Sequence, residues 1–134
     1  MPPVVNKKDT HHNNVCEDLM RERAAVLSRA GNALSDALDA LAALEYDIEV
    51  KIQITENLKM GENAEKSHRE EALFAEVNGD IEKFNAERRK AQLKYYYFIV
   101  TREAMGLRRH DRVFEIYKLP EKKEKITGLL NGPI

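Results

Sequence analysis

The chain has 134 residues, of which 34% are charged, with a formal net charge of −1 at pH 7 and a single cysteine. One cysteine cannot form an internal disulfide, the first residues lack the apolar core of a secretory signal, and no stretch approaches the ~20 apolar residues that cross a bilayer. These features exclude a disulfide-stapled domain and a membrane-spanning protein, and we expect one cytoplasmic domain.

The charges are distributed unevenly along the chain. Residues 1–82 contain nine basic and seventeen acidic side chains, whereas residues 83–112 contain nine basic and three acidic ones. If the chain folds back near Gly61, residues 40–82 form an acidic tip and residues 83–112 a basic base. Such a field steers charged partners and favours antiparallel self-association.

Residues 1–14 are polar and include two prolines, a composition typical of a disordered N-terminal arm. From Val15 to about Met60, and again from Glu62 to about Met105, the chain contains no proline. Each of these two segments is expected to form a helix of about 44 residues, or roughly 65 Å. They are joined near residues 59–63.

Both segments carry apolar residues at alternating spacings of three and four, the pattern of a coiled-coil seam. The seam of the first segment consists of Leu27, Ala30, Leu34, Ala37, Leu41, Leu44 and Ile48. The seam of the second consists of Phe74, Val77, Ile81, Phe84, Ala91, Tyr95, Phe98 and Met105. Because the connection is short, the matching seams predict an all-α fold: a long antiparallel helical hairpin. Arg88 and Arg102 interrupt the second seam, where they either fix the register or extend their guanidinium groups to solvent.

Two glycines lie inside the predicted helices, where each costs about 1 kcal/mol relative to alanine. Counting outward from Gly61 places Gly31 opposite Ala91 and Gly79 opposite Ala43. A contact between small residues would give both glycines a purpose. The alternative is that Asn78 and Gly79 break the second helix.

The segment after the second helix has its own signals. Gly106 is placed to cap the C-terminus of that helix, and Asp111 is placed to N-cap a short third helix that ends near Lys118. We expect this helix to pack at the base of the hairpin. Residues 15–119 then form the folded part, and residues 120–134 a charged, loosely ordered tail.

The first helix has a second row of apolar residues beside its seam, and one partner helix cannot cover both. The row consists of Ala33, Ala40, Ala43, Val50 and Ile54. We predict that it mediates self-association, and that two hairpins form a homodimeric four-helix bundle.

The second helix carries four consecutive aromatic residues, Tyr95 to Phe98, next to a cluster of basic residues. Aromatic and arginine side chains together are typical of binding surfaces, but for the aromatic run we favour the alternative that the first helix and the short third helix cover it. The candidate contact residues for a partner or for nucleic acid are Arg88, Arg89, Lys90, Lys94, Tyr96, Tyr97, Arg108, Arg109 and Arg112.

The sequence contains no nucleophile elbow, phosphate-binding loop or dinucleotide fingerprint. A metal site is not expected either, because His11 and His12 with Cys16 lie on a predicted arm and the Glu-x-x-His spacing of Glu65 and His68 occurs once. We therefore expect a non-enzymatic interaction or scaffold protein without cofactor, metal or small-molecule substrate. The alternatives are a nucleic-acid-binding protein that uses residues 83–112, and a small chaperone or inhibitor that binds a foreign helix.

Overall fold

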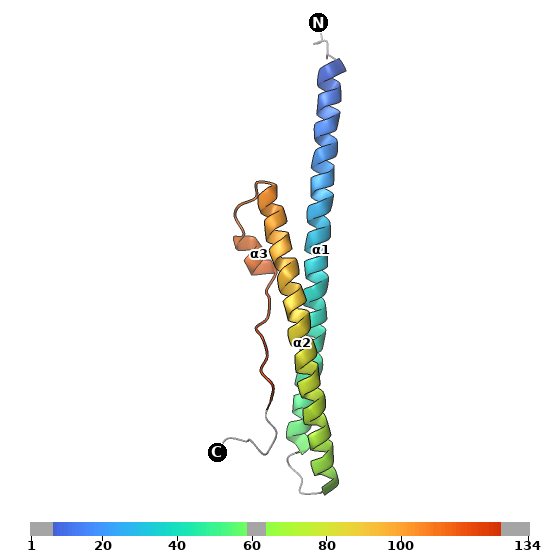
Figure 1. Ribbon diagram of the computed structural model, residues 1–134, viewed down its shortest axis with the longest axis vertical. Helices are drawn as coiled ribbons and strands as arrows, with labels where there is room; N and C mark the ends of the chain where they lie inside the picture. The colour runs from blue at the N-terminus through green and yellow to red at the C-terminus, as the bar shows by residue number, and fades with distance from the viewer. Residues whose placement is uncertain (1–6, 59–63, 127–134) are drawn as a thin grey trace.

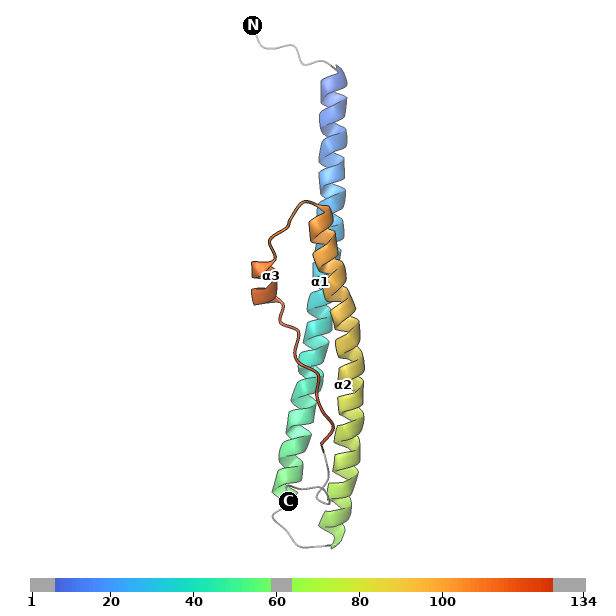
Figure 2. The same ribbon diagram turned by 60° about the vertical axis from the view of Figure 1, so that its left-hand side comes forward.

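The computed structural model describes residues 7–58 and 64–126, which form three helices: α1 (Lys7–Leu58), α2 (Ala64–Ala104) and α3 (Asp111–Ile116). The predicted all-α class is confirmed for this part of the chain. α1 and α2 lie side by side and run in opposite directions, and α3 lies beside them (Figures 1 and 2). The predicted connection at residues 59–63 lies outside the described residues, as do residues 1–6 and 127–134.

α1 begins at Lys7, eight residues before the predicted start at Val15. Residues 7–14, which we expected to be part of a disordered arm, are therefore helical. Extending an existing helix fixes one residue for each hydrogen bond gained, and this stretch contains no proline that would stop it. Asp9 lies in the first turn, where a negative charge interacts favourably with the helix dipole.

The buried core lies along the line of contact between α1 and α2, and every residue of the predicted α1 seam is buried or half-buried. One cluster, towards the connection, consists of Leu41, Ile48, Val77, Ile81, Phe84 and Ala91. A second cluster, at the other end, consists of Ala30, Leu34, Phe98 and Val113, so that α3 contributes to it. Each large side chain buried here contributes about 1.5–3 kcal/mol to the free energy of unfolding.

The register between the helices differs from the one expected for a turn centred on Gly61. A Cβ atom on Gly31 would lie 3.3 Å from Cε2 of Phe98, so Gly31 faces Phe98 and not Ala91. The expected position was wrong by seven residues. A shift of one heptad keeps every seam residue in the seam, so the apolar pattern alone cannot distinguish the two registers.

Gly79 does not make the expected contact with Ala43. It is exposed, and a Cβ atom at this position would have no heavy atom within 4 Å beyond its own backbone surroundings. α2 is nevertheless continuous through Asn78 and Gly79, so these residues do not break the helix.

The Gly106 prediction is confirmed: this residue has φ +85° and ends α2. The N–H of Gly106 donates to the carbonyl of Glu103 (2.9 Å), and the N–H of Leu107 donates to that of Arg102 (2.9 Å), which is a Schellman motif. The Asp111 prediction was wrong. Asp111 is the first residue of α3, and the preceding residue, His110, makes no side-chain capping hydrogen bond. Asp111 still places a negative charge in the first turn.

Gly79→Ala is expected to raise the free energy of unfolding by about 1 kcal/mol, because it removes a helix-interior glycine and the added methyl group meets open space. Thermal or denaturant unfolding measures the change. Gly31→Ala is the matched comparison, and it should gain less because its methyl group must displace the Phe98 ring. Equal gains at both positions would contradict the observed register.

Candidate functional site

The C-terminal segment after α3 is held along the helices by side-chain amides. Residues 117–126, which we call the strap, run in non-helical form beside α2 towards the connection (Figures 1 and 2). The Asn85 side chain donates to the carbonyl of Lys123 (2.8 Å) and accepts from its N–H (2.9 Å). The Asn78 side chain makes the same pair of bonds with Ile126, at 3.0 and 2.9 Å.

The contacts are spaced so that two turns of helix in α2 match three residues of the extended strap. Asn78 and Asn85 are seven residues apart, or about 10.5 Å along a helix. Lys123 and Ile126 are three residues apart, or about 10 Å in an extended chain. Arg88 continues the series, because its Nε donates to the carbonyl of Pro120 at 2.6 Å, three residues before Lys123. α2 therefore binds the main chain of the strap at every third residue.

Side chains of the strap add apolar and ionic contacts. Leu119 and Ile126 pack against the core cluster near the connection. Lys123 pairs with Glu45 of α1 (Nζ–Oε2, 3.2 Å), and Lys125 pairs with Glu82 of α2. Residues 120–126 of the predicted loose tail are therefore bound along the two helices.

We expect the double variant Asn78→Ala/Asn85→Ala to loosen the strap, because four hydrogen bonds worth about 1 kcal/mol each are lost. Hydrogen exchange at residues 119–126 measures the loss as faster exchange of the Lys123 and Ile126 amides. Asn32→Ala, at an exposed position of α1, is the control for the higher helix propensity of alanine. Unchanged protection in the double variant would show that the remaining apolar, ionic and Arg88 contacts hold the strap without the two asparagines.

The strap should also respond to acid. Hydrogen bonding to the Lys125 ammonium lowers the pKa of Glu82 below its ordinary value of 4.5. A carboxyl whose pKa is lowered in the folded state stabilises that state above its ordinary pKa, and loses this contribution as the pH falls through the lowered value. Protection of the strap should therefore be higher in the native chain than in Glu82→Gln at neutral pH, and the difference should vanish in acid. A difference that persists in acid would contradict this assignment.

The aromatic run is divided between core and surface. Phe98 is buried and meets Tyr117 edge-on at 5.4 Å between ring centroids. Tyr95 is half-buried and stacks on Phe114 at 6.1 Å, and this burial raises the pKa of its hydroxyl. Tyr96 and Tyr97 are exposed. Core packing thus accounts for Tyr95 and Phe98, and the binding role predicted for Tyr96 and Tyr97 stays a prediction.

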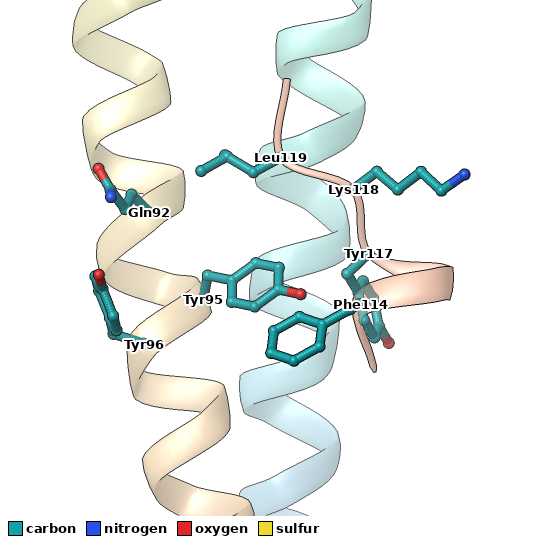
Figure 3. Close-up of a pocket in the computed structure, with 7 residues that line it drawn as sticks. All are labelled: Gln92, Tyr95, Tyr96, Phe114, Tyr117, Lys118 and Leu119. Atoms are coloured by element: carbon teal, nitrogen blue, oxygen red, sulfur yellow. The ribbon is translucent and has the colours of Figure 1, made fainter. Parts of the chain in front are cut away.

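A cavity of about 450 Å³ lies where α2 meets α3 and the strap. Its lining consists of Gln92, Tyr95 and Tyr96 from α2 with Phe114, Tyr117, Lys118 and Leu119 (Figure 3). The rings of Tyr95 and Phe114 face each other, and the ammonium group of Lys118 points away from them (Figure 3). The lining suits an apolar or aromatic group. Sequence reasoning missed the cavity because it forms only when the strap returns along α2.

The two arginines that interrupt the α2 seam both hold the C-terminal segment, a role that sequence reasoning missed. Arg88 binds the strap as described. Arg102 donates through Nε to Nδ1 of His110 (3.3 Å) and through Nη2 to the carbonyl of Arg109 (2.9 Å). Arg88 is therefore a structural residue and not a free contact for a partner.

The other predicted contact residues are all exposed. They are Arg89, Lys90, Lys94, Tyr96, Tyr97, Arg108, Arg109 and Arg112. Lys90 forms an ion pair with Glu87 at 3.2 Å, one helical turn away. Exposed basic and aromatic side chains thus lie along the half of α2 remote from the connection and on the segment that follows it.

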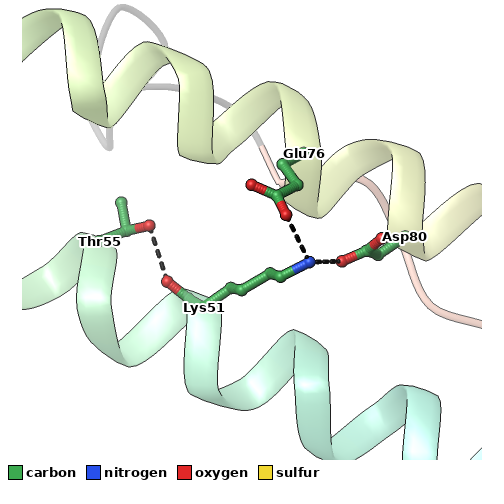
Figure 4. A network of polar contacts seen from close by, with 4 residues as sticks. All are labelled: Lys51, Thr55, Glu76 and Asp80. Carbon is green, nitrogen blue, oxygen red and sulfur yellow. Dashed lines mark hydrogen bonds and ion pairs between the residues drawn. The ribbon is translucent and has the colours of Figure 1, made fainter.

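Near the connection, an ionic network links α1 to α2 (Figure 4). Lys51 Nζ lies 2.8 Å from Glu76 Oε1 and 2.6 Å from Asp80 Oδ2, and the Thr55 hydroxyl donates to the Lys51 carbonyl at 2.9 Å. The two carboxylates raise the pKa of Lys51 above its ordinary value. This network fixes the register between α1 and α2 near the connection, and the Gly31–Phe98 contact fixes the same register near the other end of α2.

The predicted self-association row faces solvent. Ala40, Ala43, Val50 and Ile54 are exposed and Ala33 is half-buried. The row continues towards the N-terminus at heptad spacing through Val26 and Leu19, and Val15 lies about one helical turn beyond Leu19. We call this set the outer stripe: Val15, Leu19, Val26, Ala33, Ala40, Ala43, Val50 and Ile54.

α1 extends well past the end of α2 (Figure 1). Residues 7–25 are all exposed, a helical overhang of about 28 Å. Val15, Leu19 and Met20 are among its exposed side chains. The outer stripe thus runs from Val15 on the overhang to Ile54 near the connection, and six of its eight residues are exposed.

The remaining candidates concern the predicted arm and the Glu65–His68 spacing. Cys16 Sγ lies 3.7 Å from His12 Nε2 on the exposed overhang, and no group of three or more potential metal ligands occurs among the described residues. The Glu65 side chain lies outside the described part. None of the described helices has an apolar stretch that could cross a membrane.

Comparisons of the chain with protein-family models, curated proteins and solved structures found no match. The function must therefore be argued from the geometry alone.

Proposed function

We propose that this protein is an interaction or scaffold protein that acts through its helix faces, and that its first partner is a second copy of itself. The observation that carries this proposal is the unpartnered face of α1. Residues 11–25 of α1 are all exposed and lie beyond the end of α2. Farther along the helix, the outer stripe is exposed at Ala40, Ala43, Val50 and Ile54 and half-buried at Val26 and Ala33.

Such a face is costly to leave in water. Helical segments that lack tertiary packing are only marginally stable, and most of the stability of a helix comes from burying an apolar face. Val15, Leu19, Val50 and Ile54 are each 40–48% exposed in the single chain. Packing two chains through this stripe would bury these four side chains in each chain. It would also convert two antiparallel helix pairs into a four-helix arrangement.

Val50→Glu and Ile54→Glu should each weaken self-association by roughly 100-fold or more, because an unpaired carboxylate would be buried in an apolar contact. Light scattering after size exclusion should give the dimer mass for the native chain and the monomer mass for both variants. Circular dichroism should show unchanged helix content. Leu93→Glu, at a site on α2 that is 69% exposed, is the matched control and should remain dimeric. Equal mass for all four proteins would contradict the proposal.

The nucleic-acid alternative rests on the exposed arginines of residues 83–112, in particular Arg108 and Arg109. Binding through phosphate contacts falls steeply with salt, so a flat titration against DNA and RNA at low salt would remove it. A native chain that is monomeric at both low and high salt would instead favour the third function, a chaperone or inhibitor whose apolar stripe binds a foreign helix.

A further inference from the structure

The outer stripe has a two-row pattern that specifies how a second copy would bind. Written as heptads, one row of α1 consists of Leu19, Val26, Ala33, Ala40, Asp47 and Ile54. The second row consists of Val15, Glu22, Arg29, Asp36, Ala43 and Val50. In an antiparallel pair of helices, a residue from one row faces a residue from the other row of the partner.

We propose that α1 of one copy packs against α1 of a second copy in the opposite direction, with Leu19 facing Val50 and Val15 facing Ile54 of the second copy. Facing residue numbers then add up to 69 along the whole contact. This assignment rests on the proposed function, since it takes the outer stripe as the self-association surface. It adds the orientation and the register.

The register follows from the distribution of large and polar residues. In the proposed register Val26 faces Ala43, and each of the four exposed aliphatic side chains faces another aliphatic side chain. A shift of one heptad in one direction places Leu19 opposite Asn57 and Ile54 opposite Glu22. A shift in the other direction places Val15 opposite Asp47 and Ile54 opposite Lys8. Of these three registers, only the proposed one places an aliphatic side chain opposite each of the four exposed aliphatic residues.

The same register gives the overhang a partner. Residues 11–25 of one copy lie alongside residues 58–44 of the other copy's α1. The exposed part of each α1 is thus covered by the half of the second copy that lies near its connection. The two α1 helices overlap over about 48 residues, or roughly 70 Å.

Charge favours this orientation as well. Gly31 faces Phe98 within one chain, so the end of α2 at Ala104 lies level with about residue 25 of α1. In the antiparallel pair that end lies level with about residue 44 of the second copy. Arg108 and Arg109 follow directly on this end, and Asp47 and Glu49 lie there on the second copy. The basic segment after α2 in each copy is thus brought to the acidic half of the second copy's α1.

Two symmetry-related layers oppose the contact. Glu22 faces Asp47 of the second copy, and two facing carboxylates repel each other. Near the centre of the contact, Arg29 of one copy lies within about one helical turn of Asp36 of the second copy. These two side chains carry opposite charges and attract each other. The arrangement therefore leaves the apolar layers at the two ends as the main source of affinity.

Disulfide cross-linking tests the register directly. In a Cys16→Ser background, Leu19→Cys/Val50→Cys should form a covalent dimer under mild oxidation, seen on a non-reducing gel. The two cysteines of one chain are 31 residues apart on a straight helix, about 46 Å, and cannot bond to each other. Leu19→Cys alone should not cross-link. The register controls are Val26→Cys/Val50→Cys and Leu19→Cys/Ala43→Cys, which report the two shifted pairings.

The outcomes separate this inference from the function on which it rests. Light scattering under reducing conditions gives the mass of each variant. A dimer that cross-links only through positions 19 and 50 supports the register. Cross-linking of Leu19→Cys alone indicates a parallel pair and overturns it, as does preferential cross-linking of either register control, or a dimer in which no pair cross-links. A native chain that is monomeric by mass overturns the proposed function together with this inference.

Discussion

The contact between Phe98 and Gly31 sets the relation between the two long helices, and most other features of the molecule depend on it. Because Gly31 has no side chain, the aromatic ring lies against the α1 backbone, and α2 takes a register in which its end lies level with residue 25 of α1. Lys51 holds the same register near the connection through Glu76 and Asp80. A register shifted by one heptad, with Gly31 against Ala91, would shorten the overhang by two turns and separate Lys51 from its carboxylates.

The strap makes the α1–α2 pair asymmetric. It fills the side on which Asn78 and Asn85 of α2 and Glu45 of α1 are found. At 100° per residue, Glu45 is separated around the axis of α1 by about 140° from Ala40 and by about 160° from Ala43. The outer stripe therefore lies on the side away from the strap. The chain's own C-terminal segment occupies one side of the pair and leaves the outer stripe of α1 uncovered within the described residues.

The sequence predicts what local periodicity determines, and fails where a feature depends on distant residues. The seam, the outer row and the Gly106 cap follow from spacing and from the backbone freedom of glycine. The structure shows the seam buried or half-buried, and the row exposed except at the half-buried Ala33. The register did not follow, because a one-heptad shift preserves the apolar pattern. The cavity was missed for a related reason, since residues more than 20 positions apart line it.

Asn78 and Arg88 illustrate the limit most clearly. From the sequence, Asn78 next to a glycine indicates a helix break, and Arg88 in a seam indicates a register device. In the structure both bind main-chain groups of the strap, more than 30 residues further along the chain. Main-chain groups are present at every residue, so no side-chain pattern in the strap marks where they are bound. The only trace left in the sequence is the heptad spacing of Asn78 and Asn85 on one helix face, which matches three residues of an extended chain.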